Sequence, residues 1–449
     1  MNKSRHIVAI EIGSSKIKGA VGEVEPGGSL TVRAVEEEKQ SPNYVRYGGV
    51  QNVKEVANVL NGIIMKLNNR ISPAKVSAVY LGVGGRSLMA VQRQIDITLP
   101  EELEITHDMV DELLERAKSS LNPDREVVEV EPGEFVVDNM SITVPVGTVG
   151  RTMSAEVNVI NCRAQMLRNL NLAVTEKLGL KINGYVVRQT ALAEMVLTDD
   201  ERLGVMLVDC GAETSTVSIY KGGVLRYLNT VPLGSRHITR DIMALHYSEE
   251  RAEELKKAVG NANPHGNMQS GLRLEGIDDT EINNYVSARA GEIVVNVAEQ
   301  ISYAGLSAAD LPSGIVVVGG GSMLAGFCDE LGDFTNMTVR RGTLPSSVKQ
   351  ASGSKIRMAD DVDVIALLYK LSKEATAPCV TVTAPKMETV QQNVSAADGR
   401  KGNDNGFDSD DDDIERIPGR NFLSKLWGKI KEGVTPPEFV DDDDEEEDD

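Results

Sequence analysis

The sequence predicts an α/β fold of two similar lobes, with a small α+β subdomain inserted into the first lobe. Three observations predict this fold. A strand–turn–strand pattern occurs twice, about 200 residues apart, a stretch of different character separates the two copies, and an apolar strand ending in three glycines follows the second copy. A chain of 449 residues with 41% hydrophobic content is long enough for more than one domain.

The two copies of the pattern share the same order of residue types. Residues 6–23 read HIVAIEIGSSKIKGAVGE and residues 204–220 read GVMLVDCGAETSTVSIY. In each, an apolar strand ends in an acid, then come a glycine and hydroxyl residues, and then a second apolar strand, which is typical of a β-hairpin with a tight polar turn. Because each hairpin opens its own region of alternating strands and helices, the sequence indicates a duplicated α/β domain.

The stretch between the hairpins predicts the inserted subdomain, residues 84–162. It contains an alternating strand at 88–99, a helix at 106–121 with Thr106 as its N-cap, and strands at 126–130, 134–137 and 153–160. We therefore expect a first lobe from residues 1–83 and 163–196. The second lobe would span 197–375, with a smaller part at about 233–310.

Further elements continue this α/β pattern. Residues 165–178 predict a helix, 180–188 an extended segment, 190–197 an alanine-rich helix and 287–305 another helix. Residues 314–326, GIVVVGGGSMLAG, place a fully apolar strand directly before three glycines and a hydroxyl. That order is typical of a strand that ends at a ligand.

The two hairpin turns and the third glycine turn together predict a nucleotide site. Two turns that offer backbone N–H groups and hydroxyls suit the β- and γ-phosphates, and glycines allow a nucleoside to approach the backbone. Lys16 would pair with phosphate oxygens, and Glu11 and Asp209 would hold water-coordinated Mg²⁺. One such turn is usually only a turn, so the prediction depends on all three. The predicted nucleotide-binding residues are Glu11, Gly13, Ser14, Ser15, Lys16, Asp209, Gly211, Thr214, Ser215, Gly319, Gly320 and Gly321.

Composition excludes several other classes of protein. A net charge of −21 argues against a nucleic-acid binder, whose affinity depends on clustered lysine and arginine. The four cysteines are far apart without a CxxC pair, and the five histidines show no ligand spacing with them, so neither disulfides nor a zinc site is expected. We find no signal peptide and no apolar run approaching ~20 residues, which predicts a cytoplasmic chain.

The C-terminal region loses periodicity from about residue 376. It carries 20 acidic and 8 basic residues, so more than half of the net charge lies there. We predict a disordered acidic linker at 376–418 and an acidic tail at 435–449.

Between the linker and the tail, residues 419–434 predict an amphipathic helix with one apolar face. Apolar residues recur there at helical spacing, and lysines lie on or beside the opposite side, which suits a helix in the headgroup plane of a membrane. The alternative is a helix packed on the protein's own core, but a tether of roughly 43 residues, spanning ~35 Å, favours the membrane. The predicted membrane-binding residues are Phe422, Leu423, Leu426, Trp427, Ile430, Lys425 and Lys429.

These motifs resemble the actin, Hsp70 and sugar-kinase superfamily. EIGSSK resembles its first phosphate motif, VDCGAETSTVSIY its second and VVVGGGSMLAGF its adenosine motif. Within that superfamily the chain most resembles the FtsA family of bacterial cell-division proteins, over residues 5–375 and the terminal helix. The features that select this family are the segment LGLKINGYVVRQTALAEMVLTDDERLGVMLVDCG, the position of the insertion, and an amphipathic helix after a linker.

The resemblance implies an actin-like two-lobed ATPase fold that binds ATP and Mg²⁺ and polymerises in an actin-like manner. It also implies binding to the tubulin-like division GTPase, whose C-terminal tail would dock within residues 233–310, to anionic membrane lipid and to other division proteins. The expected location is the cytoplasmic face of the bacterial inner membrane at the division site, as a peripheral protein.

Two positions depart from the family pattern, since Glu213 stands where glycine is usual and Thr216 replaces the usual acid. Glu11 is a smaller departure, from the aspartate more usual in the superfamily, and proteins similar to the FtsA family tolerate it. A Glu213 carboxylate aimed into a phosphate pocket would oppose a nucleotide by roughly 4 kcal/mol at 4 Å and an effective dielectric of ~20. The objection disappears if Glu213 points to solvent or helps to hold Mg²⁺. We therefore expect ATP binding with weak or no hydrolysis.

Two other classes remain open. A small-molecule kinase of the same superfamily would need a catalytic aspartate, and Thr216 occupies the position where an acid is most expected. An actin-like ATPase of shape, pilus or segregation type would carry its additional subdomain elsewhere or have a different one.

Overall fold

A computed structural model describes residues 4–118, 123–142, 144–264, 277–352, 356–357, 360–374 and 376–382. All of them belong to one compact unit, residues 1–385. The predicted helix at 419–434 with its membrane-binding residues, the acidic tail, and the predicted linker beyond residue 382 lie outside the described residues.

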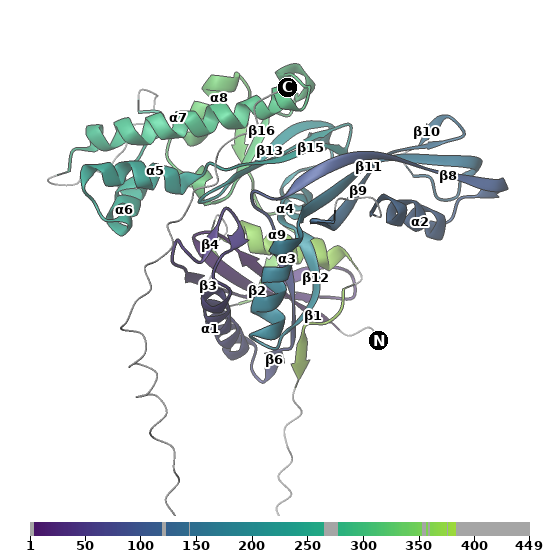
Figure 1. Cartoon of the computed structure of the whole chain (residues 1–449), viewed down its shortest axis with the longest axis horizontal. Coiled ribbons are helices and arrows are strands. Elements are labelled where there is room, and N and C mark those ends of the chain that lie inside the picture. Colours follow the sequence, from purple (N-terminus) through teal and green to yellow (C-terminus); the bar gives the residue numbers. More distant parts are fainter. Residues whose placement is uncertain are drawn as a thin grey trace, which may run out of the picture. The chain divides into compact units, whose positions relative to one another are not determined.

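The first lobe is built on a six-stranded sheet (Figure 1). Strands β1 to β3 form an antiparallel meander, because apolar and β-branched residues alternate with small ones along both arms of the first predicted hairpin. Strands β7 and β12 continue the sheet parallel to β1, and β18 adds to β3. The order is β12 (Lys181–Val187), β7 (Ala78–Val83), β1 (Arg5–Ile12), β2 (Lys16–Val24), β3 (Leu30–Lys39) and β18 (Val348–Gln350).

Helices cover this sheet, and shorter elements complete the lobe. Helix α1 begins at a capped end, where the side chain of Asn52 accepts a hydrogen bond from the backbone N–H of Glu55. A π-helical turn, Leu172–Glu176, extends α3, so the predicted helix at 165–178 is confirmed. The remaining elements are α1 (Val53–Ile71), α3 (Ala164–Asn171), α4 (Arg188–Val196), α9 (Val362–Lys373), β4 (Val45–Arg46), β5 (Gly49–Val50), β6 (Ala74–Val76) and β19 (Val380–Val382).

The second lobe repeats the strand order of the first. Its five-stranded sheet runs β17 (Val339–Arg341), β16 (Ile315–Val318), β13 (Gly204–Cys210), β14 (Ser215–Lys221) and β15 (Val224–Val231). As in the first lobe, an antiparallel meander is followed by two parallel strands on the side of its first strand. This shared order confirms the duplicated α/β fold that the two hairpins predict.

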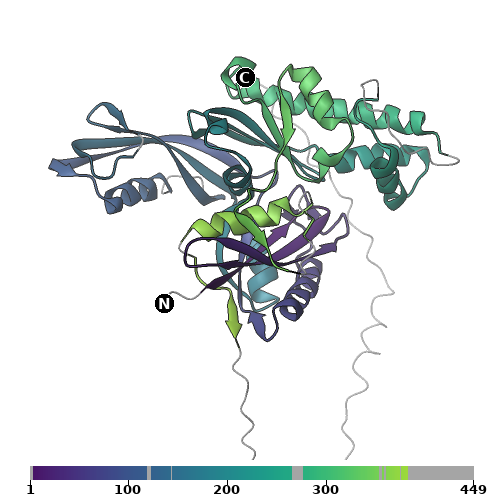
Figure 2. The ribbon, with the colours of Figure 1, turned by 180° about the vertical axis from the view of Figure 1, so that it is seen from behind.

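Helices of the second lobe pack on one face of its sheet around a core of their own. Figure 1 shows α5, α6 and α7 grouped on the same side of the β13–β15 meander, and the reverse view in Figure 2 shows the same grouping. Ile238, Leu255, Ile293 and Phe327 are among the buried side chains of this core. The helices are α5 (Ser235–Ile242), α6 (Glu249–Val259), α7 (Asp279–Tyr303) and α8 (Phe327–Thr335).

The inserted subdomain is a four-stranded antiparallel sheet with one helix, which confirms the predicted α+β character of the insertion. The helix α2 (His107–Lys118) begins at Thr106, whose hydroxyl accepts a hydrogen bond from the N–H of Met109 at 3.3 Å, so the predicted N-cap is confirmed. The strands are β10 (Met140–Ile142), β9 (Arg125–Val137), β11 (Val149–Arg163) and β8 (Met89–Glu104).

The prediction of two short strands at 126–130 and 134–137 is wrong, because β9 runs through both. The register against β11 shifts between Ala155 and Val157, and this irregularity accommodates Pro132. A Cβ on Gly133 would lie 2.6 Å from the carbonyl oxygen of Glu156, so glycine allows the close approach of the two strands.

Two predicted boundaries also differ from the structure. The second lobe does not extend to residue 375, since β18 joins the first sheet and α9 buries Val364, Ile365 and Leu368 in the core of the first lobe. The predicted disordered linker does not begin at 376, because β19 pairs with β6 in an antiparallel register. The β-branched run from Val380 favours this strand.

A partly buried group of charges joins the insertion to α9. The ammonium of Lys370 lies against the carboxylate of Glu129 and 3.4 Å from that of Glu131, both on β9, and its Nζ donates to the hydroxyl of Thr190 at 3.0 Å. Burial, together with the neighbouring Glu129 carboxylate, raises the pKa of Glu131 to about 8. Burial also acts to raise the pKa of Glu129, but hydrogen bonding from Glu131 and the charge of Lys370 lower it overall. The pair therefore retains one proton near neutral pH.

We expect the Glu131→Gln substitution to remove a pH-dependent loss of stability. An acid whose pKa rises on folding contributes stability that is fully present below about 4.5, the value for the unfolded chain, and is lost as the pH rises to about 8. The unfolding free energy of the variant minus that of the wild type should increase by about 1 kcal/mol or more from pH 5 to pH 8. Denaturant unfolding at the two pH values measures this difference. Glu134→Gln, on an exposed position of the same strand, is the control, and an equal difference at both pH values would contradict the expectation.

Candidate nucleotide-binding site

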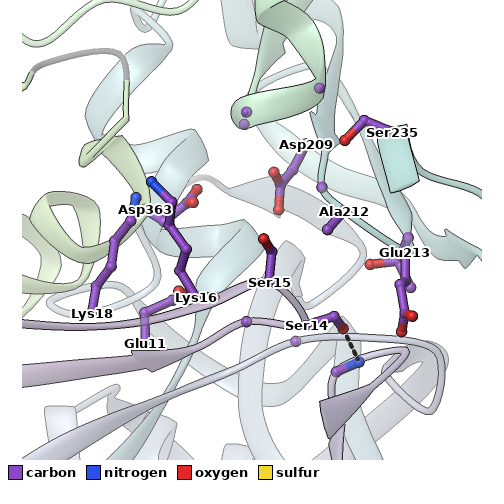
Figure 3. A pocket seen from close by; sticks show the side chains of 18 of the residues that line it. Glu11, Ser14, Ser15, Lys16, Lys18, Asp209, Ala212, Glu213, Ser235 and Asp363 are labelled. Carbon is purple, nitrogen blue, oxygen red and sulfur yellow. Dashed lines mark hydrogen bonds between the residues drawn. The ribbon is translucent and has the colours of Figure 1, made fainter. Parts of the chain in front are cut away.

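The three polar turns predicted from the sequence converge on one cavity of about 630 Å³. Figure 3 shows Ser15 from the first lobe and Asp209 from the second lobe pointing into it. Every predicted nucleotide-binding residue except Ser215 lines this cavity, namely Glu11, Gly13, Ser14, Ser15, Lys16, Asp209, Gly211, Thr214, Gly319, Gly320 and Gly321.

The two hairpin turns are closed by equivalent hydrogen bonds. The N–H of Gly13 donates to the carbonyl oxygen of Lys16 at 3.0 Å, and the N–H of Gly211 donates to that of Thr214 at 2.8 Å. The duplicated fold thus presents the same turn from each lobe to the same cavity. Two facing turns of this kind suit a chain of phosphates, which the backbone N–H groups and hydroxyls of both turns can approach.

The third turn needs glycine for a steric reason. Gly319, directly after β16, has a φ of +83°, and a Cβ there would lie 2.5 Å from both Oδ1 of Asp209 and the carbonyl oxygen of Cys210. The strand therefore ends with its backbone in contact with the acid at the end of β13. This contact places the glycine turn beside Asp209 in the wall of the cavity.

Ser215 lies away from the cavity. Its hydroxyl, at the start of β14, donates to the carbonyl oxygen of Leu233 at 2.8 Å. The next residue, Thr216, is also buried, and its hydroxyl lies 3.2 Å from that of Thr230. The position at which a small-molecule kinase would need an acid is therefore filled by a threonine that bonds within the sheet.

Lys16 and Lys18 bring two ammonium groups from β2 to the same wall of the cavity, as Figure 3 shows. The ammonium of Lys16 pairs with Glu37 at 3.0 Å, and its side chain is about one quarter exposed. Lys18 is buried, with Asp361 3.8 Å away. A phosphate would therefore compete with Glu37 for the Lys16 ammonium.

The two acids predicted to hold magnesium are bridged by an arginine. Nη1 of Arg188, at the start of α4, donates to Oε1 of Glu11 at 2.9 Å, and Nη2 lies 2.7 Å from Oδ2 of Asp209 as an ion pair without a directed hydrogen bond. Burial raises the pKa of Glu11 to about 7 and that of Asp209 to about 6, and the charge of Arg188 acts against this rise at both. The guanidinium thus favours the ionised form of each acid.

The acid pair does not suit a divalent cation in this arrangement. A metal ion bridging Glu11 and Asp209 would have to displace the Arg188 guanidinium or lie beside it in a buried, poorly screened setting, where like charges repel strongly. The water-coordinated magnesium expected at these acids stays a prediction from the sequence.

Glu213 is neither exposed nor beside the acid pair. Its side chain is 1% exposed and accepts a hydrogen bond from the N–H of Tyr47 at 2.8 Å. Arg236 and Arg240, both on α5, each place a guanidinium nitrogen 3.3 Å from its Oε1. Two cations therefore balance the carboxylate that the sequence suggests would repel a nucleotide.

The same group of charges links the two lobes. Nη1 of Arg236 also donates to the carbonyl oxygen of Ser14 in the first turn at 2.9 Å, and the N–H of Gly48 donates to the Ser14 hydroxyl at 3.2 Å. Glu213 and Arg236 belong to the second lobe, and Ser14 and Tyr47 to the first. We call this set of residues, Ser14, Tyr47, Glu213 and Arg236, the interlobe latch.

Several of these functional residues were not predicted from the sequence. Arg188, Lys18 and Asp363 line the cavity, and Arg236 reaches the first turn from α5. One signal was available for Arg188 and Lys18: each is a lone charge in a largely apolar run, YVVRQTAL and IKGAV. A lone charge in a buried strand or helix usually has a specific partner.

The fold and the cavity define the class of protein. Two lobes of the same strand order, enclosing a cavity lined by two equivalent polar turns and a glycine turn, make up an actin-like fold with an inserted subdomain. Among solved structures, the PilM–PilN type IV pilus biogenesis complex matches this fold with a TM-score of 0.58 at 16% sequence identity, covering 82% of this chain and 98% of that chain.

Comparison with known families identifies the chain more closely. The family model "Cell division protein FtsA" matches residues 206–355, and the model "SHS2 domain inserted in FTSA" matches residues 85–161, the inserted subdomain. The cell division protein FtsA of Escherichia coli strain K12 is 30% identical over 345 residues, covering 71% of this chain and 80% of the relative. FtsA of Porphyromonas gingivalis is 27% identical over 399 residues, covering 85% of this chain and 81% of the relative.

The chain therefore belongs to the FtsA family of cell division proteins. This membership confirms the resemblance stated from the motifs and supports a role in cell division, at the division site. Among the described residues, no helix is long and apolar enough to cross a membrane.

Proposed function

We propose that this protein is an ATP-binding, actin-like element of the division ring that attaches the ring to the cytoplasmic membrane. It would polymerise, bind the tubulin-like division GTPase and contact anionic lipid through residues 419–434. The observation that carries the nucleotide part is the convergence of two equivalent turns and a glycine turn on one cavity. The sequence of the terminal helix carries the membrane part.

For the nucleotide, we propose binding with weak or no hydrolysis. Arg188 holds the carboxylates of Glu11 and Asp209, which limits their freedom to orient a water molecule for attack. Magnesium, where present, would accompany the phosphates of the incoming nucleotide. ATP affinity in millimolar magnesium with little phosphate release is the expected result, and absence of any ATP affinity would refute this part.

For the membrane, we expect deletion of residues 421–434 to abolish sedimentation with anionic liposomes. The apolar side chains of the helix would each contribute about 1 kcal/mol or more on entering the interface, and each nearby lysine about 1 kcal/mol. Without them, only the acidic tail and linker remain beyond the lobes, and anionic lipid repels both.

The control for this experiment is a chain lacking residues 435–449, which keeps the helix and should sediment at least as well as the full chain. Circular dichroism checks that both truncated chains keep the fold. Equal sedimentation of the full chain and the chain without 421–434 would mean that the helix is not the anchor.

For the partner, we propose that the GTPase tail docks on the smaller part of the second lobe, residues 233–310. The helices α5, α6 and α7 form this part around their own core. Liposome-bound protein should bring the purified GTPase into the pellet, and the chain without 421–434 should leave it in the supernatant. GTPase that sediments equally in both samples would contradict the tethering role.

A further inference from the structure

The residue that sets the charge at the base of the cavity is Arg188, which begins α4 where the chain leaves β12. Its guanidinium contacts Glu11 of the first lobe at 2.9 Å and Asp209 of the second lobe at 2.7 Å. Those two acids lie 177 and 21 residues from Arg188 in the sequence. One fixed cation thus joins one acid from each lobe.

The surroundings of Arg188 are shaped for the guanidinium. Its side chain is 14% exposed, and a Cβ on Gly84 would lie 3.2 Å from its Cζ, so a residue without a side chain forms the adjacent wall. Burial alone lowers the pKa of Arg188, but the carboxylates of Asp209, Glu11 and Asp363 raise it above its usual range. The group is therefore a permanent positive charge.

The geometry also disfavours a second cation between Glu11 and Asp209. The guanidinium presents a different nitrogen to each carboxylate, so both acids already have a short ionic contact. A divalent ion needs several oxygen ligands at short range, and its approach to the same two carboxylates brings it against the guanidinium in a poorly screened site.

We propose that Arg188 is the resident counter-ion of this acid pair, holding the place in which a divalent cation would otherwise bridge Glu11 and Asp209. In the wild-type protein the pair takes up no divalent metal. One consequence rests on the proposed nucleotide site. The phosphates of a bound nucleotide would meet a cation that belongs to the protein, so nucleotide binding would not require metal at the acid pair.

The experiment measures the uptake of Mn²⁺ by the full-length protein without nucleotide, at pH 8, from the electron paramagnetic resonance signal of free Mn²⁺. Wild type and Asp209→Asn should take up Mn²⁺ equally, through sites elsewhere such as the acidic tail. Arg188→Gln should gain about one Mn²⁺ site per chain that the wild type lacks, because a fixed positive charge has been removed from two buried carboxylates. The double variant R188Q/D209N should lose that site again.

Arg226→Gln is the matched control, since Arg226 forms an ion pair with Glu156 outside the cavity and its loss should leave Mn²⁺ uptake unchanged. A fall in Mn²⁺ uptake from wild type to D209N would overturn the proposal, as would a folded R188Q that gains no site. If R188Q does not fold, the comparison of wild type with D209N still tests whether the acid pair of the wild type takes up metal. Failure of the protein to bind ATP would refute the nucleotide proposal and leave these metal measurements unaffected.

Discussion

Replacing Glu213 by alanine is expected to cost about 2 kcal/mol of unfolding free energy, because it removes a buried carboxylate that Arg236, Arg240 and the N–H of Tyr47 share. Arg236 is 8% exposed and would keep one carboxylate partner, the partly exposed Glu249 at 3.3 Å. Removing one member of a buried charge group is costly since its partners stay desolvated while losing an ionic contact. Thermal or denaturant unfolding measures this loss.

The same substitution should loosen the interlobe latch. The N–H of Tyr47 donates to Glu213 across the lobes at 2.8 Å, so its protection from hydrogen exchange depends on that carboxylate. We expect faster exchange at Tyr47 and the adjoining Gly48 in the variant, at a temperature where the fold persists. The latch contacts join the two lobes, and they give the glutamate at position 213 a structural role.

Glu156→Ala is the control for Glu213, because Glu156 also pairs with an arginine but its side chain is 41% exposed. Exposed ion pairs contribute ~0–1 kcal/mol, so this variant should unfold almost as the wild type does. If both variants lose the same stability, or if exchange at Tyr47 does not change in Glu213→Ala, the latch has no role in closing the lobes.

The Gly319→Ala substitution is expected to disrupt the cavity itself. Alanine at a φ of +83° costs about 1–2 kcal/mol in backbone strain. The new Cβ would also overlap Oδ1 of Asp209 and the carbonyl oxygen of Cys210, each 2.5 Å away. Relief of that overlap has to move the glycine turn or the acid, and either movement changes the wall of the cavity.

We expect Gly319→Ala to lower the melting temperature and to weaken binding of a fluorescent ATP analogue by at least about tenfold, equal to a loss of ~1.4 kcal/mol. Gly320→Ala is a closely matched control, since a Cβ there meets nothing within 4 Å and its φ lies outside the left-handed region. The unfolding free energy of that variant should stay within ~0.5 kcal/mol of wild type, so it controls for the loss of stability alone. Equal binding by wild type and Gly319→Ala would remove the glycine turn from the nucleotide site.

Local patterns in the sequence were sufficient for the two hairpins and for the three turns that line the cavity. Alternating apolar residues around the turns at Gly13 and Gly211 predicted both hairpins, because the side-chain period of a strand is two and glycine permits the turn. Thr106 predicted the start of α2 through its capping hydroxyl. Equivalent hairpins at two places in the sequence then indicated a duplicated fold.

The sequence failed where a segment returns to a distant part of the fold. The predicted second lobe runs to residue 375 and so includes helix α9, yet Val364 and Leu368 pack into the core of the first lobe. Apolar periodicity shows that a helix has a buried face, but it does not show which sheet buries that face. The same reason explains why β19, paired with β6, was predicted as linker.

By itself, the sequence determined the two α/β lobes, the insertion and the residues of the three turns, because these depend on local residue periodicity and turn chemistry. Only the tertiary structure decided the charges in the cavity. Arg188 comes to lie between Glu11 and Asp209, and Arg236 beside Glu213, through contacts between segments far apart in the chain. The effect of a charge depends on the nearest opposite charge and on burial, and both are set by folding.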